Sequence, residues 1–304
     1  MSTKSIKQKS VSNIDINSFL KSLILLLKPR VMSLVIFTCA VGYITSNSTI
    51  ETINAIVGII LVAIGAGAAG CLNMWYDSDI DALMTRTCLR PIPTGKITRN
   101  YALVYGLALT VISVILLNYF TNFLSAALLL FTILFYILVY TIWLKRKTPQ
   151  NIVIGGAAGA LPPIIGWTIA TNSISLEPIS LFLIIFFWTP SHFWALSLYK
   201  AGDYKKAKIP MLPVIAGPEF TGTKMVLYSL EVWATSIIFA PVAGMGAIYL
   251  CGALILGGVF VYLSLQVRRH KTEQSAMRLF GFSITYLTLL FLIIAIDELV
   301  RSGF

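Results

Sequence analysis

Three polar residues, Asn73, Asp77 and Asp81, stand four positions apart in the stretch NMWYDSDID (73–81), which ends a long apolar run. At 3.6 residues per helical turn, each four-residue step turns a side chain by about 40° and advances it by about 6 Å. We therefore expect the three side chains to share one helix face, with Asp79 pointing elsewhere. Carboxylate and amide oxygens in such a row suit Mg²⁺, which completes its octahedron with water and phosphate oxygens.

A solvated helix end that carries like charges is the alternative interpretation of this row. In that case Asp77 and Asp81 would repel each other, because residues at positions i and i+4 are neighbours on a helix. Ionisable groups at membrane depth are also costly and usually face a functional cavity. The spacing and the position together favour a metal site.

Basic residues follow the acids in the stretch RTCLRPIPTGKITR (86–99), where Pro91, Pro93 and Gly95 interrupt the helix. Carboxylates that hold Mg²⁺ beside arginine and lysine side chains form a site suited to a diphosphate. Another acid, Asp203, begins a second stretch in which basic residues and prolines follow an acid, DYKKAKIPMLP (203–213). Both loops are therefore expected to serve one pocket, and a diphosphate site beside lipid suits an isoprenoid diphosphate.

The elements that must position these loops are membrane-spanning helices. The chain has 304 residues and is 57% hydrophobic and 12% charged, whereas soluble domains have about 25% charged residues. Its apolar runs have the length of spanning helices and lack the alternation of barrel strands. We predict an all-α integral membrane protein, with a polar tail at 1–20 and a transmembrane domain at 21–304. The predicted spans, about nine, are 23–45, 52–75, 100–118, 121–144, 150–170, 176–199, 223–243, 245–267 and 277–296.

The net charge of +11 follows from topology rather than from nucleic-acid binding. If the helices alternate in direction, every lysine and arginine except Arg301 lies on one side of the membrane. This distribution is the positive-inside pattern, with a cytoplasmic N-terminus. The short polar tail favours the inner (plasma) membrane of a bacterium over a mitochondrial inner membrane.

The stretch GAGAAG (65–70) has the spacing of a dinucleotide-binding fingerprint. That fingerprint requires a preceding strand and the start of a helix, whereas these glycines lie inside an apolar run. Small residues at this spacing let transmembrane helices approach closely. We therefore predict a packing surface here.

Four blocks in order resemble the UbiA-type intramembrane prenyltransferases. The row from Asn73 to Asp81, followed by RTCLRPIPTG, is similar to the first signature of that family. The blocks YTIWLKRKTPQNIVIGGAAGALPPIIGW (140–167), TPSHFWALSLY (189–199) and DYKKAKIPMLPV (203–214) look like its haem O synthase branch. The resemblance runs from about Lys28 to the last helix.

This resemblance implies a nine-helix bundle in which haem B and farnesyl diphosphate give haem O, with Mg²⁺ as the cofactor. By position, the metal and the diphosphate would be held by Asn73, Asp77, Asp81 and Asp203. The basic residues that contact diphosphate oxygens would be Arg30, Arg86, Lys96 and Arg146, and Tyr140 would lie near the allylic end. Many relatives have a second acid four residues after Asp203. Here that residue is Ala207, which agrees with the haem branch and weakens the case for a second metal.

Aromatic faces can stabilise the allylic cation by cation–π contact. Candidates near the mouth of the pocket are Trp75, Tyr76, Tyr140 and Trp143. His192 follows Pro190 within an apolar helix. Either it is satisfied by a neighbouring backbone group at a proline kink, or it contacts haem as an axial ligand.

Two other functions share parts of this pattern. A prenyltransferase for another aromatic acceptor, such as 4-hydroxybenzoate, would have the same diphosphate site, but we would expect an acid at position 207. A haem-handling membrane protein without catalysis would need substrate groups near the midplane, whereas the charges here cluster at one face. The expected partners are farnesyl diphosphate, haem B and the lipid bilayer, with a downstream haem A synthase or terminal oxidase assembly.

Overall fold

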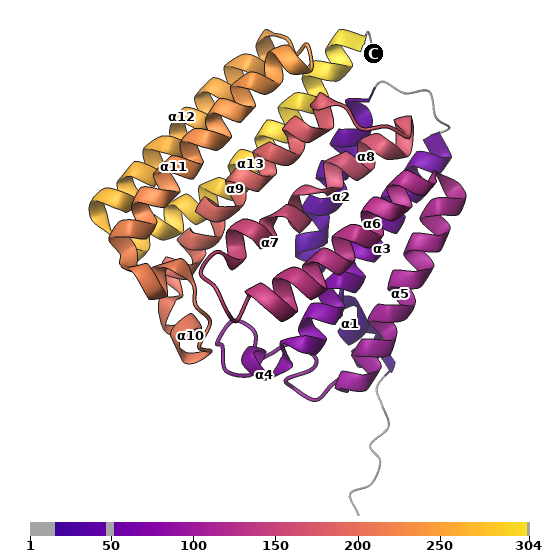
Figure 1. Cartoon of the computed structure of the whole chain (residues 1–304), viewed down its shortest axis with the longest axis vertical. Helices are drawn as coiled ribbons and strands as arrows, with labels where there is room; N and C mark the ends of the chain where they lie inside the picture. Colours follow the sequence, from indigo (N-terminus) through magenta and orange to yellow (C-terminus); the bar gives the residue numbers. More distant parts are fainter. Residues whose placement is uncertain (1–15, 47–51, 303–304) are drawn as a thin grey trace, which may run out of the picture.

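The computed structural model describes residues 16–46 and 52–302, and every regular element in these residues is a helix. The bundle is shown in Figure 1. In chain order the elements are α1 (Ile16–Leu26), α2 (Pro29–Ile44), α3 (Thr52–Tyr76), α4 (Ser78–Asp81), α5 (Arg99–Phe120), α6 (Phe123–Leu134), the π-helix η1 (Phe135–Leu144), α7 (Asn151–Ala160), α8 (Pro162–Thr171), α9 (Leu176–Tyr199), α10 (Ala201–Lys206), α11 (Leu212–Val242), α12 (Ala247–His270) and α13 (Glu273–Ser302).

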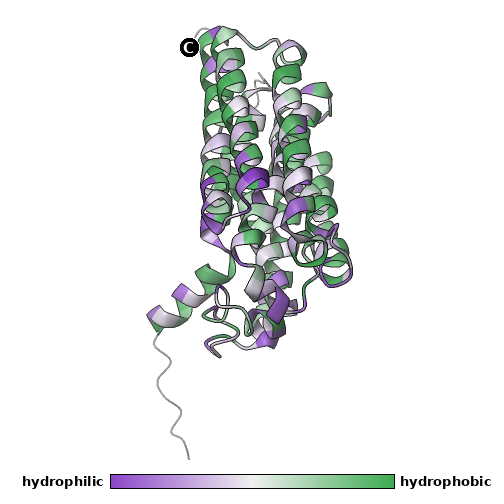
Figure 2. Cartoon of the chain, turned by 90° about the vertical axis from the view of Figure 1, so that its left-hand side faces the viewer, coloured by the Kyte–Doolittle hydropathy of each residue, from purple (hydrophilic) through white to green (hydrophobic). Residues whose placement is uncertain are grey.

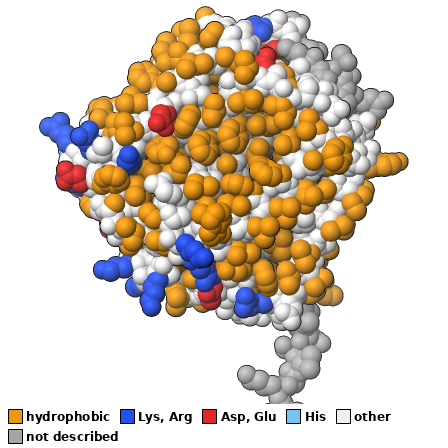
Figure 3. Space-filling view, viewed as in Figure 1, with side chains coloured by type: hydrophobic (Ala, Val, Ile, Leu, Met, Phe, Trp, Pro, Cys, Tyr) orange, Lys and Arg blue, Asp and Glu red, His pale blue; other side chains and the backbone are white. Residues whose placement is uncertain are grey.

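The chain is an integral membrane protein. Over the described ranges, eight helical segments are long and apolar enough to cross a membrane, and the bent pair α1–α2 makes a ninth. Two of the eight are composite: α6 continues into η1, and α7 into α8. Hydrophobic side chains cover most of the face seen in Figure 3, as a surface in contact with lipid requires. The predicted bundle of about nine spans is confirmed.

The helix boundaries agree with the predicted spans within three residues, except at the starts of the first and seventh spans and at both ends of the last, where α13 runs from Glu273 to Ser302 instead of 277–296. α9 has the predicted bounds, but α11 begins at Leu212 instead of residue 223 because a short first segment precedes a turn at Gly217, whose φ is 77°. α1 begins at Ile16, inside the stretch predicted to be a polar tail. The rest of that stretch lies outside the described residues.

Two loops lie together at one end of the bundle, which we call the polar end. The loop after α3 contains α4 and the loop after α9 contains α10, and both short helices lie at the bottom of Figure 1. Hydrophilic residues are frequent at this end in Figure 2. Thr85 Oγ1 donates a hydrogen bond to Asp203 Oδ1 (2.8 Å), which joins the two loops.

Glycines permit the close helix contacts on which this arrangement depends. A Cβ on Gly166 of α8 would lie 1.9 Å from the Cys39 carbonyl oxygen of α2, so these two backbones meet directly. The glycine run of α3 also packs against neighbours, since a Cβ on Gly65 would lie 2.9 Å from Leu129 and one on Gly70 would lie 3.2 Å from Lys28. The prediction of a packing surface at 65–70 is confirmed.

Candidate active site

The acidic row lies where α3 passes into α4. α3 ends at Tyr76, but the backbone continues with helical spacing: Asp77 N–H donates to the Asn73 carbonyl (2.9 Å) and Asp81 N–H donates to the Asp77 carbonyl (2.8 Å). All three side chains are buried. Asn73 Nδ2 donates to Asp77 Oδ2 at 2.7 Å, so the first two members of the row are in direct contact.

Asp77 is the centre of the cluster and has no exposed surface (0%). Lys145 forms an ion pair with its Oδ2 atom, and the Arg146 guanidinium lies 3.5 Å from Oδ1. Oδ1 nevertheless receives no hydrogen bond from the described residues. A buried carboxylate requires a compensating charge. Lys145 and Arg146 supply the positive charge that a bound cation would otherwise supply to Asp77.

Lys28 reaches the same cluster from the break between α1 and α2. Its backbone is left-handed (φ 52°), and its ammonium donates to Asn73 Oδ1 at 2.7 Å. The ammonium also lies 5.9 Å from the centre of the Tyr136 ring. Because Gly70 has no side chain, the alkyl part of Lys28 can pass over α3. Asn73 is therefore held between a lysine and an aspartate.

The two remaining acids are held by the loop after α3. Arg90 pairs with Asp81 Oδ2 at 2.6 Å. The Thr85 hydroxyl bonds Asp203, and this hydrogen bond lowers the pKa of the Asp203 carboxyl below its ordinary value. Asp203 Oδ2 is buried and has no hydrogen-bond donor among the described residues. Each side of the site thus contains one buried carboxylate oxygen that is free to accept.

Oxygen donors of this kind fit a divalent cation. Asp77 Oδ1 and Asp203 Oδ2 accept no hydrogen bond from the described residues, and the Asn73 amide oxygen close by accepts only from Lys28. In the part of the chain that the structure describes, no three Asp, Glu, His or Cys side chains lie close enough to hold one ion by themselves. A cation at this site would therefore need oxygens from a ligand or from water, as Mg²⁺ commonly does.

Tyr140 lies on the π-helix η1, beside the acidic row. Its carbonyl accepts from Lys145 N–H (2.8 Å), and its ring stacks on Tyr136 with centroids 5.3 Å apart. The Lys145 ammonium lies 6.0 Å from the centre of its ring. π-Helical turns occur often at functional sites, and this one presents Tyr140 and Lys145 to the same cluster. Trp143, a second aromatic candidate, is 57% exposed on the outer surface.

Gly155 of α7 makes the position of Tyr140 possible, because a Cβ at residue 155 would lie 2.2 Å from Tyr140 Cδ2. We predict that Gly155→Ala displaces the ring, lowers the catalytic rate and costs about 1–3 kcal/mol in stability, the usual range for overpacking. Gly159→Ala on the same helix is the control, because a Cβ there meets nothing within 4 Å. Steady-state rates and thermal unfolding of both variants measure the effect. Equal rates in the two variants would exclude this role for Gly155.

Of the predicted basic residues, Arg146 lies beside the acidic row, whereas Arg30 and Lys96 lie elsewhere. Arg146 makes two hydrogen bonds to Asp79 (2.8 and 2.7 Å), which lower the pKa of Asp79 and raise that of Arg146. Arg30 is exposed at the start of α2, whereas Lys28, two residues earlier, contacts Asn73 of the acidic row. Lys96 is exposed and lines a separate cavity with α1. The structure does not bring Arg30 or Lys96 to the acidic row.

Lys28, Lys145 and Arg90 were not predicted as site residues, although each lies in a basic stretch of the sequence. The Lys-Pro-Arg triplet 28–30, near the start of the first predicted span, and the Lys-Arg-Lys triplet after η1 are the signals that could have identified two of them. Sequence alone does not tell which member of a triplet points inward. The left-handed break at Lys28 and the π-helical turn before Lys145 decide this.

His192 lies on α9, and its Nδ1 atom is 2.6 Å from the Ser283 hydroxyl oxygen. The imidazole stacks between Trp188 and Phe280, with centroids 4.3 and 4.7 Å away. Ser283 Oγ donates to the Phe280 carbonyl (2.6 Å), so it accepts from His192 Nδ1–H and leaves the lone pair on Nε2. The histidine is bonded by a side chain from α13 rather than by a backbone group at the proline.

Comparison with known proteins identifies the family of this chain. Residues 34–292 match the UbiA prenyltransferase family. The curated protoheme IX farnesyltransferase of Pelagibacter ubique (strain HTCC1062) is 57% identical over 303 residues, which cover 98% of this chain and 100% of that protein. The protoheme IX farnesyltransferase of Rhodopseudomonas palustris (strain BisB5) is 50% identical over 281 residues, 91% of this chain and 90% of that protein.

Solved structures share the fold. A digeranylgeranylglyceryl phosphate synthase superposes with a TM-score of 0.78 at 18% identity, covering 93% of this chain and 99% of that one. A UbiA homologue from Archaeoglobus fulgidus, bound to DMAPP and Mg²⁺, superposes with a TM-score of 0.62 at 18% identity, covering 90% and 99%. At these low sequence identities, the superpositions show that the fold is shared and no more than the fold.

The fold and the site together define a membrane-embedded helical enzyme whose buried acids and lysines meet at one end of the bundle. The chain belongs to the UbiA prenyltransferase family. Its sequence resemblance to the haem O synthase branch is confirmed by the protoheme IX farnesyltransferases that it matches over nearly its whole length.

Proposed function

We propose that this chain transfers the farnesyl group of farnesyl diphosphate to a vinyl group of haem B, with addition of water, to give haem O. The observation that carries the proposal is Asp77: a fully buried carboxylate, one oxygen of which accepts no hydrogen bond from the described residues, among lysine and arginine side chains at the polar end of an apolar bundle. The near full-length relatives named protoheme IX farnesyltransferase support the choice of substrates.

The diphosphate is placed against the acidic row. Asn73, Asp77, Asp81 and Asp203 are the residues that would hold Mg²⁺, which when bound neutralises diphosphate oxygens and favours their departure. Lys28, Lys145 and Arg90 are paired with the row through hydrogen bonds and ion pairs. They would exchange these partners for phosphate oxygens, since charge-assisted bonds to phosphate are strong. Arg86 joins them from the same loop.

The bond changes follow from this placement. The allylic C–O bond breaks and its electron pair leaves with the diphosphate, while the lysines and Arg90 stabilise the developing negative charge. The positive charge on the farnesyl C1 lies near the Tyr136–Tyr140 stack, whose faces attract cations. The vinyl π electrons form the new C–C bond to C1. Water then adds to the vinyl-derived cation and loses a proton, which leaves a hydroxyl group.

The haem is placed by His192. With its Nδ1–H committed to Ser283, the Nε2 lone pair is the one available to iron, and such an outer partner fixes the tautomer of a ligating histidine. We predict that Ser283→Ala weakens haem binding by about 10–100-fold, the usual effect of removing such a partner. It should also change the absorption spectrum of bound haem.

Ser264→Ala is the matched control, because the Ser264 hydroxyl is also buried and donates to the carbonyl one turn earlier (2.9 Å) without a histidine partner. Haem titrations followed by absorbance compare the two variants. An unchanged affinity and spectrum in Ser283→Ala would remove His192 from the haem site.

Ala207 favours haem over another aromatic acceptor. Among residues 201–207, Asp203 is the only acid, so the far loop offers one carboxylate where relatives with other acceptors have two. The setting that we infer is a bacterial plasma membrane with the polar end on the cytoplasmic side. The product would pass to a haem A synthase or a terminal oxidase assembly.

The direct test of the function incubates the purified protein with haem B, farnesyl diphosphate and Mg²⁺ and follows the mass of the haem. We expect a gain equal to one farnesyl group plus one water. Turnover of 4-hydroxybenzoate with no change in haem mass would transfer the assignment to the other acceptor class. Haem binding without any transfer would favour the non-catalytic alternative.

A further inference from the structure

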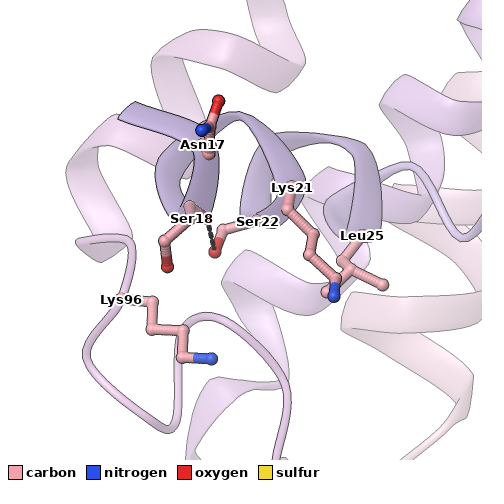
Figure 4. A pocket seen from close by; sticks show the side chains of 6 residues that line it. All are labelled: Asn17, Ser18, Lys21, Ser22, Leu25 and Lys96. Carbon is pink, nitrogen blue, oxygen red and sulfur yellow. Dashed lines mark hydrogen bonds between the residues drawn. The ribbon is translucent and has the colours of Figure 1, made fainter. Parts of the chain in front are cut away.

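A second polar site lies at the edge of the bundle, away from the acidic row. It is a cavity of about 360 Å³ between α1 and the loop that precedes α5, within the size range of small-ligand sites. Figure 4 shows the side chains that line it. They are Asn17, Ser18, Lys21, Ser22, Leu25 and Lys96.

The charges of the two lysines of this cavity are not neutralised by any carboxylate of the described residues. Lys21 on α1 and Lys96 on the loop face the cavity from opposite walls (Figure 4), and across residues 16–46 and 52–302 no carboxylate pairs with either of them. The hydroxyl of Ser22 is committed to the Ser18 carbonyl (2.8 Å). A cavity with two ammonium groups and no acid is suited to an anion.

α1 also presents a stripe of apolar side chains that the protein leaves uncovered. Ile16, Leu20 and Ile24 follow one another at four-residue spacing and are 71%, 51% and 58% exposed. A different face of the helix packs inward, where the Phe19 ring meets Tyr101 edge-on at 5.4 Å. The pair α1–α2 bends by 48°, and Figure 2 shows α1 leaning out from the bundle.

An exposed apolar stripe beside a cavity with two lysines is the arrangement expected of a helix that lies at the membrane surface next to a binding site for a lipid headgroup. An amphipathic helix at the membrane surface buries its apolar stripe among acyl chains and keeps lysines at headgroup level. A free phosphate ion would satisfy the lysines but would leave the apolar stripe without a partner. A ligand with both a phosphate and acyl chains satisfies both.

We propose that this cavity binds one anionic phospholipid, with its phosphate between Lys21 and Lys96 and its acyl chains along Leu25 and the stripe Ile16–Leu20–Ile24. The lipid would tie α1 to the loop that carries Arg90, since Leu26 of α1 already shares a hydrophobic cluster with Ile92 and Ile97 of that loop. The bound lipid would therefore stabilise the loop that carries Arg90, although the lipid itself lies outside the active site.

Native mass spectrometry of the detergent-solubilised protein, with phosphatidylglycerol or phosphatidylcholine added, tests the proposal. The wild type should retain one phosphatidylglycerol in preference to phosphatidylcholine. A basic residue near a membrane surface contributes about 1 kcal/mol toward anionic lipid, so Lys21→Gln/Lys96→Gln should weaken that retention by about 30-fold. Lys21→Arg/Lys96→Arg should restore it.

Lys147→Gln/Lys206→Gln is the matched control, because it removes two exposed lysines from the polar end outside the cavity. It should retain phosphatidylglycerol as the wild type does. Equal retention of both lipids by the wild type, or equal losses in the two double variants, would overturn the proposal. Displacement of the lipid by millimolar inorganic phosphate would show an ordinary anion site and would also overturn it. None of these readouts depends on farnesyl transfer.

Discussion

Asp77→Asn is expected to reduce farnesyl transfer by about 10²–10³-fold, the usual cost of removing one preorganised electrostatic contact from a transition state. The amide keeps the size of the side chain and can still bond Asn73, but it removes the charge that Lys145 and any bound cation require. Haem binding should persist, because His192 lies on α9 and its partner Ser283 lies on α13. Single-turnover rates and a haem titration measure the two effects separately.

Asp79→Asn is the control for this substitution. Asp79 lies two residues away and pairs with Arg146, but its side chain is 60% exposed. Its removal should change the rate by less than a few-fold, because an exposed ion pair contributes little. Full activity in Asp77→Asn, or equal losses in the two variants, would contradict the role given to the buried carboxylate.

Lys145→Gln is expected to destabilise the protein by about 3 kcal/mol, at the low end of the range for breaking a buried ion pair. The loss should be at the low end because Arg146 remains 3.5 Å from Asp77. Adding Asp77→Asn to this variant removes the uncompensated charge, so the double variant should recover most of the lost stability. The double variant should not recover activity, since Lys145 and Asp77, both assigned to the diphosphate site, are then replaced.

Unfolding by sodium dodecyl sulfate, followed by circular dichroism, gives the free energies of the four proteins in this cycle. A coupling energy near zero would show that Lys145 and Asp77 act independently and would contradict the pairing. Recovery of transfer in the double variant would show that the pair has a structural role alone.

The spans and the acidic row could be predicted from the sequence because each has a strong local signal. Apolar runs of spanning length located α9 and most other helices within a few residues. The four-residue spacing of Asn73, Asp77 and Asp81 fixed their common direction, because helical periodicity persists across the junction of α3 and α4.

The partners of the acids could not be predicted, because they depend on local backbone irregularities. Lys28 points inward owing to its left-handed backbone at the break before α2. Lys145 points inward because the preceding helix, η1, is π-helical. Amino-acid composition does not distinguish a π-helical turn from an α-helical one. The predicted role of Arg30 rests on resemblance alone and that of Lys96 also on its place in the basic stretch 86–99, but their side chains lie on other surfaces.

The affinity for farnesyl thiolodiphosphate, an analogue whose carbon–sulfur bond to the leaving group breaks slowly, tests the central claim most directly when it is measured with and without Mg²⁺. The account predicts that Mg²⁺ tightens binding to the wild type by at least tenfold and has no such effect on Asp77→Asn. An affinity that is independent of Mg²⁺ in the wild type, or equally dependent on it in both proteins, would contradict the claim that these buried acids bind the metal–diphosphate head.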